Sequence, residues 1–206
     1  LLSLGDDDAV QLFLPFLFPF FDGGYSEVFV HSDGNLTFVD PDTASSERSL
    51  SRAISGPPRI GPLFTDLDPS HAEAVVSTYS TADRFVVTWD NVPEFRLVSV
   101  GGRQTFQLVL YQDGGIEFHF ATITLNDAVV GIMPGYLQGE STPVNFDEGV
   151  QQPAHGALAE IFSSTTAIDS LALTQKFYRN HDDAYDFIAS MVAVGVLELR
   201  PSGDAS

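Results

Sequence analysis

The fold is decided by a stretch that reads TFQLVLYQDGGIEFHF, residues Thr105–Phe120. Apolar and polar side chains alternate on both sides of a glycine-containing turn, as in a β-hairpin that buries one face. A two-residue turn would place Leu110 opposite Glu117 and would mix the two faces. A three-residue loop, Gln112–Gly114, instead places Leu110 opposite Ile116, with the loop glycine in the left-handed region. The stretch therefore predicts an antiparallel hairpin with one apolar face.

A second stretch, VFVHSDGNLTFV (Val28–Val39), has the same organisation. A three-residue loop, Ser32–Gly34, again brings the apolar residues to one face. Asp33 and Asp113 precede the loop glycines, and we interpret both as turn residues because Asp bonds to nearby backbone groups in turns. The predicted pairs across this loop are Val30 with Leu36 and Val28 with Phe38.

Outward from these hairpins, short strands and turns continue from Tyr25 to about Val144. Strands of about five residues at this spacing are typical of antiparallel sandwiches and barrels. We predict an all-β fold, an antiparallel β-sandwich with long loops and one C-terminal α-helix. The helix is expected within STTAIDSLALTQKFYRN (Ser164–Asn180), and one or two strands within Tyr185–Arg200.

Two domains follow from this division of the chain. Residues 1–156 form the predicted β-sandwich, and residues 157–206 form an extension of helix and strand, which packs on the sandwich or leads to a further domain. Two irregular segments lie within the sandwich. Pro41–Pro58 is polar and rich in serine, so we expect an exposed, mobile loop, and its apolar period is too weak to predict a helix. Gly135–Gly156 is the second irregular segment.

Composition excludes several classes of function. The formal net charge is −19, which opposes binding to nucleic acid or to an anionic membrane surface. The apolar run LFLPFLFPFF (Leu12–Phe21) is too short to span a bilayer and contains two prolines, so we expect no membrane insertion. The chain has no cysteine, and it therefore has no disulfide and no thiolate site.

The candidate chemical residues are carboxylates. In RIGPLFTDLDPSH (Arg59–His71), Asp66 and Asp68 project to the same side if the backbone is extended, which suits a shared calcium ion. The alternative is that both acids end a strand and bond to the following turn. Catalysis with His71 would need a cleft and a perturbed carboxylate. We assign no catalytic and no cofactor-binding residue, and we keep Asp66 and Asp68 as a candidate calcium pair. Further acids that could supply oxygen ligands are Asp40, Asp42, Asp182, Asp183 and Asp186.

Five stretches in order resemble the nidogen-like (NIDO) extracellular domain. The resemblance implies a β-rich secreted or cell-surface module without catalysis of its own. The absence of cysteine departs from animal members and fits a microbial exported protein. The stretches are LPFLFPFFDGGYSEVFVHSDGNLTF (14–38), PPRIGPLFTDLDPS (57–70), FVVTWDNVP (85–93), TFQLVLYQDGGIEFHF (105–120) and AVVGIMPG (128–135).

From this resemblance we expect a non-enzymatic extracellular adhesion or interaction module that binds protein or glycan at a cell surface or in a matrix. The expected contact segments are the Pro41–Pro58 and Gly135–Gly156 loops, because sandwiches present loops at their ends. The alternative is a carbohydrate-binding or accessory domain of a secreted multidomain hydrolase or peptidase, stabilised by calcium.

Overall fold

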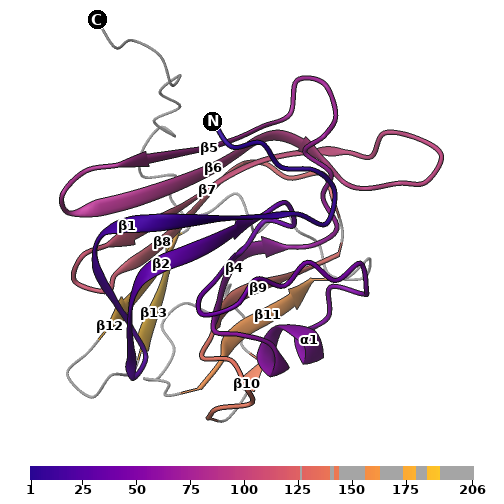
Figure 1. The fold of residues 1–206 in the computed structure, drawn as a ribbon. Helices are drawn as coiled ribbons and strands as arrows, with labels where there is room; N and C mark the ends of the chain where they lie inside the picture. The colour runs from indigo at the N-terminus through magenta and orange to yellow at the C-terminus, as the bar shows by residue number, and fades with distance from the viewer. Residues whose placement is uncertain (126, 140–141, 144–155, 163–173, 180–184, 191–206) are drawn as a thin grey trace, which may run out of the picture.

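The computed structural model describes residues 1–125, 127–139, 142–143, 156–162, 174–179 and 185–190. These residues form two β-sheets that face one another, with one short helix beside them (Figure 1). The prediction of an all-β fold built from two antiparallel sheets is confirmed. One parallel pair, β10 with β11, is the exception.

The first sheet has seven strands and the second has six. In spatial order, the first sheet consists of β1 (Ala9–Phe20), β2 (Gly23–His31), β3 (Leu36–Thr37), β4 (Arg59–Phe64), β9 (Ala128–Met133), β11 (Leu158–Phe162) and β10 (Thr142–Pro143). The second consists of β13 (Tyr185–Ser190), β12 (Thr174–Arg179), β8 (Ile116–Thr122), β7 (Arg103–Tyr111), β6 (Arg84–Pro93) and β5 (Val75–Ser80).

The main core lies between the inner faces of the two sheets and is rich in aromatic rings. Phe18 of the first sheet and Phe118 of the second are fully buried in the same cluster. Trp89 stacks on Phe106 with ring centroids 5.0 Å apart, and its indole N–H donates to the carbonyl of His31 at 2.9 Å. That hydrogen bond joins the second sheet to the first and satisfies the one polar atom of a buried Trp.

Both predicted hairpins form. Leu110 lies opposite Ile116, and Gly114 has a φ of +92°, as the three-residue loop requires. Val30 lies opposite Leu36, and Gly34 has a φ of +66°. The second hairpin is shorter than predicted because β3 ends at Thr37. The expected pair of Val28 with Phe38 does not form, and the Phe38 N–H donates to the carbonyl of Pro58 at 2.9 Å.

The prediction for Pro41–Pro58 is wrong in part. The segment contains the helix α1 (Leu50–Ser55), which Ser49 caps by accepting a hydrogen bond from the Arg52 N–H. Figure 1 shows α1 beside the first sheet, near β9. The helix covers a second, smaller core on the outer face of this sheet, whose members are Ala53, Phe64, Val129, Met133, Ala157 and Ala159.

The C-terminal helix prediction is wrong where it can be compared. Thr174–Arg179 form β12, which pairs with β8 and places Phe177 against Phe118 at 5.0 Å between ring centroids. The remainder of the predicted helix, Ser164–Leu173, lies outside the described residues. Of the strands expected from Tyr185 on, β13 forms. The strands after residue 156 join both sheets, and the domain boundary at that position stays a prediction.

Candidate functional site

Arg48 organises the acidic residues at the end of the sandwich where β4 finishes. Its side chain is 6% exposed and reaches three carboxylates that are far apart in the sequence. The guanidinium contacts Asp7 at the N-terminus, Asp33 in the β2–β3 turn at 2.9 Å, and Asp66 just after β4 at 3.0 Å. Arg48 therefore joins the Pro41–Pro58 segment to three other parts of the chain, which is why that segment is not a free loop.

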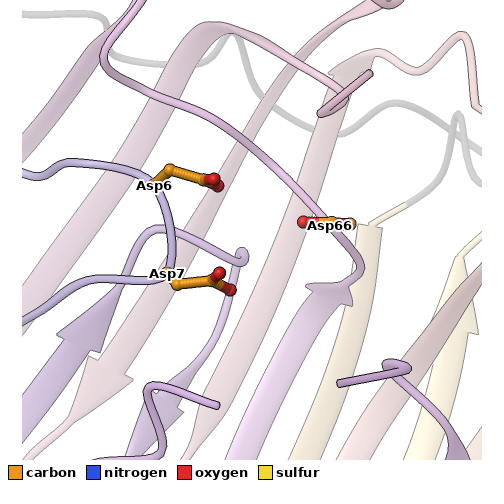
Figure 2. A group of neighbouring side chains, drawn as sticks. All are labelled: Asp6, Asp7 and Asp66. Carbon is orange, nitrogen blue, oxygen red and sulfur yellow. The ribbon is translucent and has the colours of Figure 1, made fainter. Parts of the chain in front are cut away.

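Three carboxylates of this end could together hold a metal ion. Figure 2 shows Asp6 and Asp7 on the N-terminal segment, with their carboxylates directed toward Asp66. One oxygen of each lies within 4.8 Å of the others. Arg48 already bonds two of the three, however, and so it supplies the positive charge that a cation would otherwise bring.

The expected pair Asp66 and Asp68 divides between two roles. Asp66 belongs to the group around Arg48. Asp68 is buried, and its carboxylate accepts the Ser70 N–H at 2.9 Å, as an aspartate does in a turn. The other Asp68 oxygen lies 3.4 Å from Nε2 of His71. The candidate metal group therefore consists of Asp66, Asp6 and Asp7. The role of Asp66 and Asp68 as a calcium pair stays a prediction.

Burial and mutual repulsion disfavour the charged forms of these acids. Burial raises the pKa of Asp33 to about 6, although hydrogen bonding to Arg48 opposes the shift. Burial and then repulsion from Asp7, Asp68 and Asp66 raise the pKa of Asp6. Asp33 was expected to be a turn residue only, yet it is 3% exposed and also bonds Arg48.

A second ion-pair group holds the same segment closer to its start. Asp42 accepts from Arg52 at 2.8 Å and also bonds Arg59, which is fully buried and lies over the Phe64 ring at 4.2 Å. Burial would raise the pKa of Asp42, but the two arginines outweigh it and lower the value to about 2. Asp42 is therefore a structural partner of arginine in this fold, although the sequence suggested it as an oxygen ligand.

The opposite end of β4 presents an exposed apolar surface beside the place where the two predicted contact loops meet. Val39 is 57% exposed, Tyr136 is 47% exposed and Leu137 is 69% exposed. The phenol of Tyr136 donates to Asp40 Oδ2 at 3.3 Å. We call these four residues, Val39, Asp40, Tyr136 and Leu137, the Tyr136 surface.

Backbone contacts hold the Tyr136 surface in place. The N–H groups of Tyr136 and Leu137 donate to the carbonyls of Gly56 and Ile54 at 2.8 and 2.9 Å. Gly135 has a φ of +79°, and a Cβ there would lie 2.4 Å from the backbone nitrogen of Pro58. Only glycine allows this close approach. The two loops that the sequence analysis proposed separately therefore meet at one place.

Comparison with known proteins bears on this arrangement. A family model described as NIDO related matches residues 1–182. The chain belongs to the NIDO-related family. This membership confirms the resemblance seen in the sequence and indicates an extracellular module of a generally non-enzymatic type. Searches of curated proteins and of solved structures returned no match.

In this NIDO-related domain, two further histidines hold structural positions. His119 alternates along β8 with the core residues Phe118 and Phe120 and so faces away from the core, and its Nε2 lies 3.2 Å from Glu117 Oε2. His31 is buried and bonds Thr37 at 2.8 Å, and burial lowers its pKa to about 3, so it is neutral. His155, His181, Asp182, Asp183 and the side chain of Asp186 lie outside the described residues.

Within the described part of the chain, no helix has the length and apolar character needed to cross a membrane.

Sequence reasoning missed Asp6, Asp7, Arg48 and Tyr136. The run GDDD (Gly5–Asp8) was a visible signal for the first two. Arg48 could have been suspected, because the chain has 9 basic residues against 28 acidic ones, so each arginine has many available partners. No pattern in the sequence marks Tyr136, because its environment comes from a segment far away in the chain.

Proposed function

We propose that this NIDO-related domain is a non-catalytic extracellular interaction module that binds protein or glycan partners through the Tyr136 surface. The observation that supports the proposal most is the meeting of two distant chain segments there, with Val39, Tyr136 and Leu137 open to solvent. Exposed apolar side chains that are held in one rigid arrangement favour binding, because little conformational entropy is lost when a partner contacts them.

The carboxylates support a non-catalytic role. Paired-carboxylate hydrolysis needs one acid that donates a proton and another that stays ionised, held at a set separation in a cleft. Asp66 is bonded to Arg48, Asp68 caps a turn, and Asp42 is held by Arg52 and Arg59. In the described residues, these acids balance arginine charges and complete turns.

The test measures the adhesion of cells that display this protein on their surface. The variant carries Tyr136→Ser together with Leu137→Ser. The matched control carries Leu97→Ser together with Val98→Ser in the β6–β7 loop, where these side chains are 89% and 97% exposed. We expect the first variant to reduce adhesion and the control to retain it. Full adhesion by the first variant would remove the Tyr136 surface from the proposal.

The alternative function, a calcium-stabilised accessory domain of a secreted hydrolase or peptidase, stays a prediction. The group of Asp6, Asp7 and Asp66 is the feature that it would use. It requires calcium to compete with Arg48 for Asp7 and Asp66, which lowers the expected gain from binding. It predicts that a chelator lowers the melting temperature and that calcium restores it.

A further inference from the structure

The Tyr136 surface combines an aromatic ring, aliphatic side chains and a carboxylate. Asp40 is exposed, and in the described part of the chain its only side-chain bond is the one from the Tyr136 phenol to Oδ2. Arg52 and Arg59 both bond Asp42. The four residues of the Tyr136 surface thus carry one carboxylate and no basic side chain.

A second aromatic and acidic pair lies beside it. Tyr25 stacks on Phe38, the residue before Val39, with ring centroids 4.4 Å apart. Asp22 and Tyr136 are both close enough to Tyr25 to raise the pKa of its phenol, after burial, which is the larger cause. The acidic and aromatic character thus extends from Tyr136 across Val39 to Tyr25.

The backbone at this place is held in an unfavourable conformation. The Asp40 N–H donates to the Phe38 carbonyl at 2.9 Å across Val39, whose φ is +74°. This is a γ-turn of the strained kind, and a β-branched residue adopts it rarely. Tyr136 and Leu137 also have positive φ, at +50° and +59°. Strained residues persist where the surrounding structure forces them, and they concentrate at binding sites.

From these features we infer that the Tyr136 surface binds a basic peptide segment of a partner protein. A lysine or arginine side chain places its charge at Asp40 and against the Tyr136 ring, and its aliphatic stem contacts Val39 and Leu137. Cations are attracted both to carboxylates and to the faces of aromatic rings. The net charge of −19 draws such a segment toward the domain from a distance.

The same charge argues against the other ligand classes. Anionic glycans and anionic lipid surfaces are repelled by a chain with 28 acidic and 9 basic residues. A neutral glycan stacks on tyrosine without using the charge of Asp40. The inference rests on the proposed function, because it names the partner of the same surface.

The test measures binding of a fluorescein-labelled peptide that alternates glycine with arginine and lysine. A peptide with glutamate in place of the basic residues, and a neutral oligosaccharide of glucose, are the comparison ligands. The variants are Asp40→Asn and Tyr136→Ala. The matched control is Glu73→Gln, an exposed acid in the β4–β5 loop at the other end of the sandwich. Melting temperatures confirm that each variant is folded.

We expect the basic peptide to bind the wild type, and Asp40→Asn and Tyr136→Ala each to weaken binding by roughly fivefold or more. Glu73→Gln should leave the affinity within about twofold, since it removes the same charge at a distant position. Equal weakening by Asp40→Asn and Glu73→Gln would show diffuse attraction to an acidic chain and would overturn the inference.

Two further results would overturn the inference without touching the proposed function. One is tight binding of the neutral oligosaccharide that Tyr136→Ala abolishes, which would make the partner a glycan. The other is that the wild type does not bind the basic peptide, although the variant with Tyr136→Ser and Leu137→Ser still loses adhesion. A different result would contradict the proposed function itself, namely full adhesion by the variant that carries Tyr136→Ser and Leu137→Ser.

Discussion

Arg48 holds four parts of the chain together, and its loss would leave a buried carboxylate without a partner. Asp33 is 5% exposed in its side chain, and its bond to Arg48 is 2.9 Å long. Breaking a buried ion pair by removing one partner costs about 3 kcal/mol or more. We therefore expect Arg48→Gln to lower the free energy of unfolding by about 3 kcal/mol, as measured by urea denaturation.

Arg96→Gln is the matched control for Arg48→Gln. Arg96 is 56% exposed in its side chain and bonds Glu94 at 2.8 Å, so its removal should cost less than about 1 kcal/mol. Similar losses in the two variants would contradict the structural role of Arg48.

Arg48 also determines what calcium can do. In the wild type it bonds Asp7 and Asp66, so we expect neither calcium nor a chelator to change the melting temperature by more than about 1 °C. In Arg48→Gln these carboxylates lack a cation, and calcium should then raise the melting temperature. A fall of several degrees when chelator is added to the wild type would favour the calcium-stabilised alternative.

Val39 is a second residue at which a substitution should change both the free energy of unfolding and partner binding. Its positive φ costs a β-branched residue about 1 kcal/mol, and asparagine tolerates a positive φ better. Val39→Asn should raise the free energy of unfolding by about 1 kcal/mol while weakening partner binding. The same change at Val98, which is 97% exposed and has no positive φ, should leave stability unchanged. Destabilisation by Val39→Asn would show that Val39 is not strained.

At the scale of the element, the two hairpin glycines provide a paired comparison. Gly34 and Gly114 both have positive φ. A Cβ at Gly34 would lie 2.3 Å from the carbonyl oxygen of Leu63, whereas at Gly114 the nearest atom is Cδ of Arg179 at 2.9 Å. A backbone atom cannot move away as a long side chain can.

We therefore expect Gly114→Ala to cost about 1 kcal/mol and Gly34→Ala distinctly more, as measured by thermal or urea unfolding. Neutral effects at both positions would contradict the left-handed loop conformations on which the register of the two hairpins depends.

The hairpins could be predicted from sequence, whereas the Pro41–Pro58 segment could not. In Thr105–Phe120, the alternation of side chains and the turn residues are local, and together they allow only one register. In Pro41–Pro58, the order comes from Arg48 and Arg52, whose partners lie elsewhere in the chain or across a turn. Serine-rich composition indicated exposure, and nothing nearby in the sequence indicated the ion pairs.

The C-terminal strand β12 was missed for a related reason. Its apolar spacing fits a helix about as well as a strand when the segment is read alone. Pairing with the edge of β8 favours the strand over the helix, because it buries Phe177 against Phe118. Tertiary pairing overrides local propensity in such segments.

At the scale of the whole molecule, buried and crowded carboxylates make stability depend on pH. The pKa of Asp33 is raised from 3.8 to about 6, so its contribution to stability is fully present below about pH 4 and is lost as the pH rises through 6. The pKa values of Asp42 and Glu117 are lowered from 3.8 and 4.5 to about 2, so their contributions to stability are present above those unfolded values and are lost as the pH falls toward 2.

The free energy of unfolding should therefore fall between about pH 4 and pH 7, by up to about 3 kcal/mol from Asp33. Asp33→Asn should flatten this decline in urea titrations at several pH values. A stability that rises steadily from pH 4 to pH 7 in the wild type would contradict this account of the Arg48 group.

The most direct test of the central claim is site-specific photo-crosslinking on the displaying cell or in its matrix. A photoreactive phenylalanine derivative replaces Leu137 in the Tyr136 surface, or Val98 in the β6–β7 loop as the control. We expect a discrete crosslinked partner from position 137 and none from position 98. A partner captured only from position 98, or none from position 137 while adhesion persists, would contradict the claim that this domain binds through the Tyr136 surface.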